Sequence, residues 1–223
     1  MEKKHNTWNT LYSDYINNDF KNWDEYFRTK MKLKKPFFNL IVKYSIDGKP
    51  VLECGSGTGK FSVYLASLGY TAYAIDLEPA MVEQTKVLSQ NICPKNPVHV
   101  LHGDISQIPF PDKYFSLTHS SGVLEHFSDE KIVALINEQL RVANTVIFSV
   151  PSPYFEQKML GDERFMSRKE WREIISNSNA EIKEESGYHY KPIGKRIADI
   201  IEKPKRILKP IALFTFVLKE RQR

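Results

Sequence analysis

Residues 51–60 have the sequence VLECGSGTGK, in which a short apolar segment is followed by three glycines and then by the start of a helix. Glycine is needed where a chain turns sharply, or where its backbone approaches a ligand too closely for a β-carbon. The G-x-G-x-G spacing differs from the G-x-G-x-x-G of dinucleotide-binding loops, and the P-loop spacing is absent although Lys60 follows the third glycine. The stretch predicts a strand–turn–helix unit with a ligand site or, alternatively, only a tight connection.

Short apolar segments alternate with helical ones beyond this unit. We expect strands at 51–54, 71–75, 98–101, 114–120, 145–150, 180–185 and 211–219, and helices at 59–68, 79–89, 129–142 and 167–176. Ser167 and Glu170 form a capping box at the start of the last of these helices. Four isoleucines at helical spacing (Ile193, Ile197, Ile200 and Ile201) precede the final strand. The alternation predicts an α/β, Rossmann-like fold: a seven-stranded, mostly parallel sheet with helices on both faces.

The composition of the 223 residues is that of a globular protein, with 41% hydrophobic and 26% charged residues. No apolar run reaches the length that a bilayer requires, and the N-terminus lacks an apolar signal core, so we expect a cytoplasmic protein without a transmembrane segment. Cys54 and Cys93 are too few for a disulfide framework or a zinc cluster, and Cys54 is expected in the core.

The net charge of +5 is concentrated in residues 191–209, which contain seven basic and two acidic residues. No aromatic residues interleave with these charges as they would in a base-stacking surface, so we expect no nucleic-acid partner. The segment predicts either a solvated covering helix or a surface that favours an anionic partner molecule or membrane.

Two further segments provide acidic residues at the ends of expected strands. Asp76 ends the second strand, 23 residues after Glu53, where it would accept hydrogen bonds from both hydroxyls of a ribose. On the alternative interpretation, Asp76 only leads the helix that begins near Pro79. Residues 102–112, HGDISQIPFPD, follow the third strand.

These three segments, together with VLEH at 123–126, resemble the class I S-adenosylmethionine-dependent methyltransferases of the ubiquinone/menaquinone-biosynthesis-like type. The resemblance covers about residues 48–150. It implies S-adenosylmethionine as the cofactor, an antiparallel last strand, and transfer of a methyl group to the O or N atom of a small-molecule acceptor. Because the sequence shows no internal repeat and no low-complexity linker, we expect one domain, 1–223, with a helical lid (1–45), a cofactor-binding core (48–150) and an acceptor-side part (151–223).

The resemblance also implies a role for each residue that matches a family motif. The glycines should lie against the methionine part of the cofactor, Glu53 should orient its amino group, and Asp76 should hold its ribose. The adenine should meet Leu77, Asp104 and Ile105, and Ser121 should border the sulfonium. The implied cofactor-binding residues are Glu53, Gly55, Gly57, Gly59, Asp76, Leu77, Asp104, Ile105 and Ser121. The sequence departs from the family at Ser116, where an acidic residue is common, and at 142–145, where Pro-Gly-Gly is usual.

The acceptor side is expected around His126, either as the general base or as a packing residue at the turn before the next helix. Glu125 would hold its imidazole or face solvent. Some quinone-pathway relatives bind a metal through E-x-x-E-H, but Gly122 replaces the first glutamate here, so we expect no metal. Expected acceptor contacts are Tyr154, Phe155, Arg164 and Phe165, and expected lid residues are Trp23, Tyr26 and Phe27; the alternative for both sets is plain packing.

Three rival functions differ from this one in the sequence features that they require. A dehydrogenase is disfavoured by the glycine spacing and by the Gly103-Asp104 segment. A methyltransferase acting on RNA or protein is disfavoured because SSGV at 120–123 replaces the N-P-P-Y/F signature of base methylation. A catalytically inactive cofactor-binding partner protein stays open, because cofactor motifs report binding and not turnover.

Overall fold

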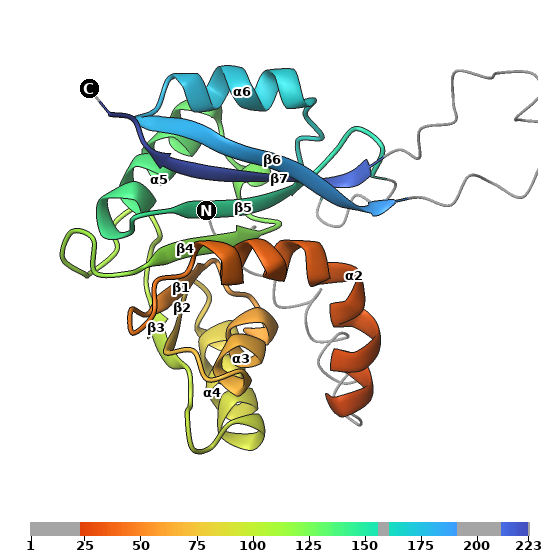
Figure 1. The fold of residues 1–223 in the computed structure, drawn as a ribbon, viewed down its shortest axis with the longest axis vertical. Helices are drawn as coiled ribbons and strands as arrows, with labels where there is room; N and C mark the ends of the chain where they lie inside the picture. The colour runs from red at the N-terminus through yellow and green to blue at the C-terminus, as the bar shows by residue number, and fades with distance from the viewer. Residues whose placement is uncertain (1–22, 156–160, 191–210, 223) are drawn as a thin grey trace, which may run out of the picture.

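The computed structural model describes residues 23–155, 161–190 and 211–222, with the side chains of 23–30, 32, 189 and 190 left out (Figure 1). Its seven strands form one sheet in the order β3-β2-β1-β4-β5-β7-β6. The strands are β1 (Val51–Cys54), β2 (Ala72–Asp76), β3 (His99–His102), β4 (Leu117–Ser121), β5 (Val146–Pro151), β6 (Ala180–Tyr190) and β7 (Ile211–Glu220). The helices are α2 (Trp23–Tyr44), α3 (Lys60–Ser67), α4 (Pro79–Ile92), η1 (Leu124–His126), α5 (Asp129–Val142) and α6 (Arg168–Ser176).

The predicted fold class is confirmed. The strands β3, β2, β1, β4 and β5 run parallel, whereas β7 pairs antiparallel with both β5 and β6. β1 and α5 have the predicted bounds, and the capping box at Ser167 is present. β4 begins three residues later than predicted, because the backbone N–H of Ser116 bonds to Pro50 O outside the regular ladder. β6 continues to Tyr190 because β7 pairs with it along that length.

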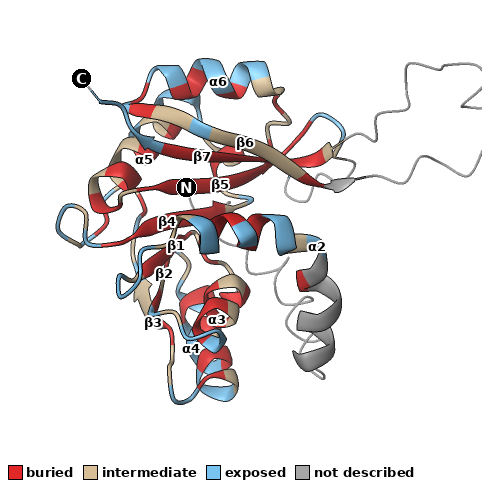
Figure 2. Cartoon of the chain, in the orientation of Figure 1, coloured by how far each residue is buried: buried red, intermediate tan, exposed pale blue. Residues whose placement is uncertain are grey.

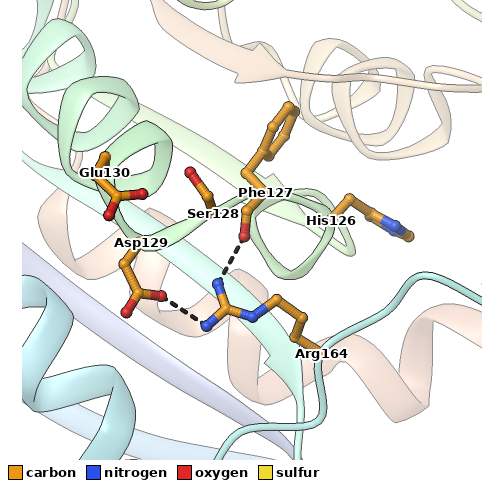
Figure 3. A pocket seen from close by; sticks show the side chains of 6 residues that line it. All are labelled: His126, Phe127, Ser128, Asp129, Glu130 and Arg164. Atoms are coloured by element: carbon orange, nitrogen blue, oxygen red, sulfur yellow. Dashed lines mark hydrogen bonds and ion pairs between the residues drawn. The ribbon is translucent and has the colours of Figure 1, made fainter. Parts of the chain in front are cut away.

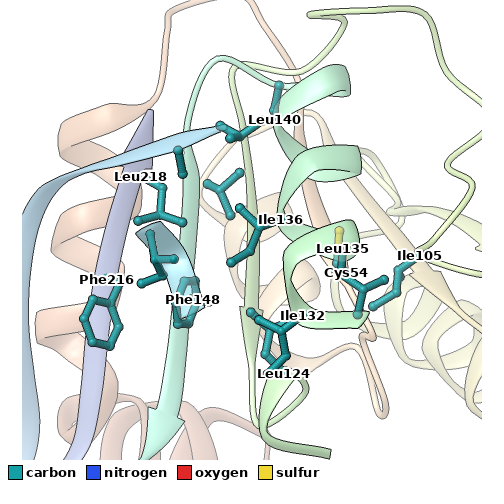
Figure 4. Close-up of a cluster of buried hydrophobic side chains, with 14 of the residues drawn as sticks. Cys54, Ile105, Leu124, Ile132, Leu135, Ile136, Leu140, Phe148, Phe216 and Leu218 are labelled. Carbon is teal, nitrogen blue, oxygen red and sulfur yellow. The ribbon is translucent and has the colours of Figure 1, made fainter. Parts of the chain in front are cut away.

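Helices cover both faces of the sheet, α5 and α6 one face and α2, α3 and α4 the other (Figure 1). Because successive side chains of a strand point to opposite faces, β1 supplies Leu52 and Cys54 to one apolar cluster and Val51 to the other. The first cluster packs beneath α5 (Figure 4). The strands β1, β4, β5 and β7 are mostly buried, whereas β3 and β6 at the two edges of the sheet are more exposed (Figure 2). Cys54 is a buried free thiol, as predicted, and its burial raises its pKa.

The basic segment 191–209, with its isoleucine pattern, lies outside the described residues. In the part of the chain that is described, no helix is both long and apolar enough to cross a membrane.

α2 crosses the sheet near β4, β5 and β6 and continues as a helix through Pro36. Phe37 and Ile41 on its inner face are completely buried. The Phe37 ring lies 5.9 Å from that of Phe61 and 6.1 Å from that of His119, between centroids. This packing fixes α2 next to the end of the sheet where β1 and β4 finish.

We predict that Phe37→Ala lowers the free energy of unfolding by about 3–5 kcal/mol, because it removes a fully buried ring and leaves a cavity. Val42→Ala on the same helix is the matched control, since Val42 is 52% exposed and its loss should change stability by less than about 0.5 kcal/mol. Urea unfolding of both variants checks this. Equal effects would show that α2 is not held by its inner face.

Candidate active site

The glycine loop between β1 and α3 has the backbone that its sequence predicts. Gly55, Gly57 and Gly59 have φ values of 67°, 51° and 67°, in the left-handed region that favours glycine. A β-carbon on Gly55 would lie 2.9 Å from Val123 Cγ2, so this glycine lets the turn after β4 approach the loop. A β-carbon on Gly59 would lie 2.2 Å from Thr85 Cγ2, which gives Gly59 a packing reason of its own between α3 and α4. A contact between Gly59 and the cofactor stays a prediction.

Asp76 ties this loop to the end of β2. Its Oδ2 accepts a hydrogen bond from Gly57 N at 2.7 Å, and its Oδ1 accepts one from Glu78 N at 2.9 Å. Burial raises the pKa of the carboxyl, and these backbone hydrogen bonds act in the opposite direction. A carboxylate oxygen has two lone pairs, so both oxygens keep acceptor capacity for ribose hydroxyls. The hydrogen bond from Glu78 N places Asp76 at the start of α4, which is the role that the alternative interpretation of the sequence gave it.

Glu53 is a buried carboxyl in the middle of the site's floor, 5% exposed on β1. Its Oε2 accepts hydrogen bonds from Ser62 N at 2.9 Å and from Ser62 Oγ at 2.5 Å. Burial raises the pKa of Glu53 to about 8, against the hydrogen bonds from Ser62, and the charge of Asp76 adds to the increase. An ammonium group nearby would stabilise the carboxylate, so this environment fits the amino group of the implied cofactor.

Residues 102–112, which begin at the last residue of β3, lie beside the end of β2. Gly103 N donates to Asp76 O at 2.9 Å, which brings the end of β3 against the end of β2. Asp104 accepts a hydrogen bond from Ser106 N at 2.7 Å; burial alone would raise its pKa, but the hydrogen bonds from Ser106 lower it. Leu77 is 52% exposed, and its carbonyl oxygen lies 3.0 Å from Nε2 of His102, while Ile105 is buried in the core. An exposed apolar side chain and a carboxylate at the ends of neighbouring strands suit an adenine ring with its amino group.

The predicted cofactor segments therefore meet at one end of the sheet. The register pairs Cys54 with Ile75 and Asp76 with His102, so β1, β2 and β3 finish together. β4 lies on the other side of β1 and ends at the half-buried Ser121. Ligands of open α/β sheets bind in this crevice, where the strand order reverses.

His126 lies at the end of η1, just beyond β4, with 10% of its side chain exposed. Its Nδ1 is 2.7 Å from Asp162 Oδ1, a partner that the sequence analysis missed. Ligand atoms of His126, Asp162 and Glu163 lie within 4.8 Å of one another, which is close enough to hold a metal ion. The expectation of a site without metal is untested.

Glu125 neither holds the imidazole nor faces solvent. It is 3% exposed, and its Oε2 has no hydrogen-bond partner among the described atoms. Burial raises the pKa of Glu125 to about 8, and the charges of Glu163 and Asp162 add to the increase. The sequence analysis named neither Asp162 nor Glu163 as a site residue, although both directly precede Arg164, which it did name.

The expected acceptor contacts fall into two groups. Arg164 braces the turn after η1: its Nη1 donates to Phe127 O at 2.7 Å and its Nη2 pairs with Asp129 at 2.6 Å (Figure 3). Tyr154 is 58% exposed, and Phe155 and Phe165 meet edge to face with ring centroids 5.9 Å apart. Their contact with an acceptor stays a prediction. Trp23, Tyr26 and Phe27 lie in the first turns of α2, but their side chains are outside the described residues.

Comparison with known proteins agrees with this geometry. Residues 51–145 match a family described as a methyltransferase domain. Malonyl-acyl-carrier-protein O-methyltransferase of Serratia marcescens is 34% identical over 105 residues, covering 46% of this chain and 38% of that protein. The chain thus spans well under half the length of this curated relative.

Two solved structures share the fold. Magnesium protoporphyrin IX methyltransferase of Synechocystis, solved with S-adenosylmethionine bound, superposes with a TM-score of 0.66 at 16% identity, covering 97% of this chain and 90% of that chain. A (4+2)-cyclase gives a TM-score of 0.61 at 14% identity, covering 84% of this chain and 82% of that chain.

Fold, glycine loop and family match define the class: the chain carries a class I S-adenosylmethionine-dependent methyltransferase domain. S-adenosylmethionine is the cofactor of that class. The family match is to residues 51–145, and the ubiquinone/menaquinone-like subtype stays a prediction.

The raised pKa of Glu53 has a measurable consequence. The native state keeps a proton on Glu53 up to about pH 8, whereas the unfolded chain loses it near 4.5. The unfolded state is therefore favoured progressively as the pH rises between these values, by at most about 1.4 kcal/mol per pH unit. We predict that Glu53→Gln, which cannot ionise, removes this loss. Urea unfolding at pH 5.5 and 7.5 checks it, and the same decline in both proteins would contradict the assignment.

Proposed function

We propose that the protein transfers the methyl group of S-adenosylmethionine to an O or N atom of a small-molecule acceptor. The observation that carries this is the convergence of the glycine loop, Asp76 and Asp104 at the ends of β1, β2 and β3. The turn after β4 reaches the same place, because Val123 packs on Gly55. The name of the Serratia relative, an O-methyltransferase, supports O-methylation without identifying the acceptor.

Specific residues of the chain would hold the cofactor. Glu53 would face its ammonium group, Asp76 its ribose hydroxyls, and Leu77 with Asp104 its adenine. The bound cofactor supplies an electrophilic methyl group on its sulfonium. The remaining work of the protein is to align the acceptor in line with that methyl group and to keep water away, which is the main source of acceleration in such displacements.

His126 is proposed as the general base. It stands just past β4, and an imidazole can accept a proton from an acceptor hydroxyl or ammonium near neutral pH. The carboxyl groups of Asp162 and Glu163 lie within 4.8 Å of its imidazole. Their negative charges favour a neutral or amine acceptor over the anionic one that the basic segment 191–209 offered as an alternative.

The reaction is tested by incubating the protein with methyl-labelled cofactor and a panel of alcohols, phenols, amines and carboxylic acids. We expect label in one of the hydroxyl or amine products, identified by its mass increase. Binding of S-adenosylhomocysteine without transfer to any member of the panel would favour the inactive partner protein over the enzyme.

For cofactor binding, we predict that Asp76→Ala raises the dissociation constant for S-adenosylhomocysteine about 10- to 150-fold. The ribose would lose a charged acceptor, worth about 1.5–3 kcal/mol. Calorimetry measures the affinities, and Glu83→Ala, which removes an exposed carboxylate from α4, is the control. Unchanged affinity in Asp76→Ala would refute the ribose assignment.

For catalysis, we predict that His126→Ala reduces turnover about 10²–10⁴-fold and leaves cofactor affinity unchanged, as loss of a general base should. His99→Ala, at an exposed position on β3, is the control and should keep full turnover. If the His126→Ala variant keeps the turnover of the wild type across pH 6–9, His126 is a packing residue and not a base.

A further inference from the structure

His119 on β4 is a buried imidazole without a hydrogen bond. Its side chain is completely buried, and neither Nδ1 nor Nε2 has a hydrogen-bond partner in the part of the chain that the structure describes. Burial lowers the pKa of His119 to about 3, so the ring is neutral and carries one N–H donor and one lone pair. Unpaired polar groups in the interior destabilise a fold, so an imidazole that is kept there calls for an explanation beyond packing.

The register of the sheet determines which side chains lie directly beside this ring. On β1 the paired residue is Glu53, and on β5 it is the buried Ile147. The Phe37 ring of α2 lies across the imidazole, with ring centroids 6.1 Å apart and ring planes inclined at 76°. Of the side chains placed directly beside His119 in this way, Glu53 is the polar one.

Glu53 and His119 project from the same face of the sheet. The Glu53 carboxyl bonds to Ser62 of α3 and the His119 ring meets Phe37 of α2, and both helices cover that face. Neighbouring strands are about 4.8 Å apart, so two side chains in register on one face are adjacent. Both hydrogen bonds from Ser62 go to Oε2 of Glu53, so Oε1 keeps its lone pairs for another donor.

The charge state of Glu53 decides how strongly it attracts such a donor. Burial raises the pKa of Glu53 to about 8, and the charge of Asp76 on β2 adds to the increase, so without a ligand the carboxyl is mostly protonated at pH 7. The ammonium group of the cofactor would stabilise the carboxylate, and the proton of Glu53 would pass to water. A carboxylate accepts stronger hydrogen bonds than a neutral carboxyl group. Bound cofactor would thus create the acceptor that the N–H of His119 lacks.

We propose that His119 is a positioning residue for the cofactor: its N–H donates to Oε1 of ionised Glu53 and holds that carboxylate toward the cofactor's ammonium group. The inference rests on the proposed contact between Glu53 and this ammonium group. Ser62 then holds one carboxylate oxygen from α3, and His119 holds the other from β4. The interaction strengthens cofactor binding and does not stabilise the ligand-free fold.

Stability and affinity measured together separate this role from packing. His119→Leu leaves no unpaired donor in the core, so its urea midpoint should equal or exceed that of the wild type. Its dissociation constant for S-adenosylhomocysteine, measured by calorimetry at pH 7, should rise about 10- to 150-fold, as for loss of a hydrogen bond to a charged group. Thr215→Val is the matched control, because the Thr215 hydroxyl is also buried and unpaired but lies on β7, two strands from β4. Its affinity should be that of the wild type.

The dependence on Glu53 is measured in a double variant. When Glu53 is already glutamine, His119→Leu should cause little further loss of affinity, because His119 acts only through the carboxylate. His119→Gln, whose side-chain amide supplies an N–H donor, should bind S-adenosylhomocysteine more tightly than His119→Leu. In wild-type protein labelled with 15N-histidine, the ring resonances that His119→Gln removes should shift on saturation with S-adenosylhomocysteine. This last readout decides the question even if His119→Leu does not fold.

Three results would overturn the inference: wild-type affinity in His119→Leu, equal losses with and without Glu53→Gln, or ring resonances that do not respond to S-adenosylhomocysteine. A marked loss of stability in His119→Leu with unchanged affinity would make His119 a packing residue or the partner of a buried water, and would also overturn it. If the wild type binds no S-adenosylhomocysteine, the proposed function itself fails. If the wild type binds and Asp76→Ala weakens binding while His119→Leu does not, only the present inference fails.

Discussion

The hydrogen bond from Gly57 N–H to Asp76 Oδ2 is the contact on which the rest of the site depends. It joins the loop after β1 to the end of β2, and it fixes the glycine loop in a conformation that leaves backbone groups, rather than side chains, at its surface. The same carboxylate bonds to Glu78 N at the start of α4. One aspartate therefore sets the relative positions of a loop, a strand end and a helix, while keeping lone pairs for a ribose.

This arrangement places carboxyl groups where burial opposes their charge. Burial raises the pKa values of both Glu53 and Glu125 to about 8, which marks two positions where a cationic group would be stabilised. Glu53 lies on the proposed cofactor side and Glu125 on the proposed acceptor side of the turn after β4. The strand and the turn that carry these groups are held by apolar packing, with α5 on one face of the sheet and α2 on the other.

Much of this was accessible from sequence. The bounds of β1 and α5 were predicted residue for residue, since each is a regular run of apolar residues at strand or helix spacing. The cofactor segments were also predictable, because each follows a strand and such strand ends meet at one edge. Asp162 was not, because its contact with His126 joins residues 36 positions apart through a loop without periodicity. The packing role of Gly59 depends on Thr85 of the next helix, and sequence spacing carries no information on that distance.

The central claim is that the ends of β1, β2 and β3 form the cofactor pocket. Backbone amide NMR spectra, recorded while S-adenosylhomocysteine is added to the full chain, test it most directly. The account predicts that the amides of Gly55, Gly57, Leu77 and Ile105 shift together in proportion to occupancy, while those of the far ends of the same strands stay unchanged. Saturable binding that leaves these four amides unshifted, or no binding at all, would contradict it.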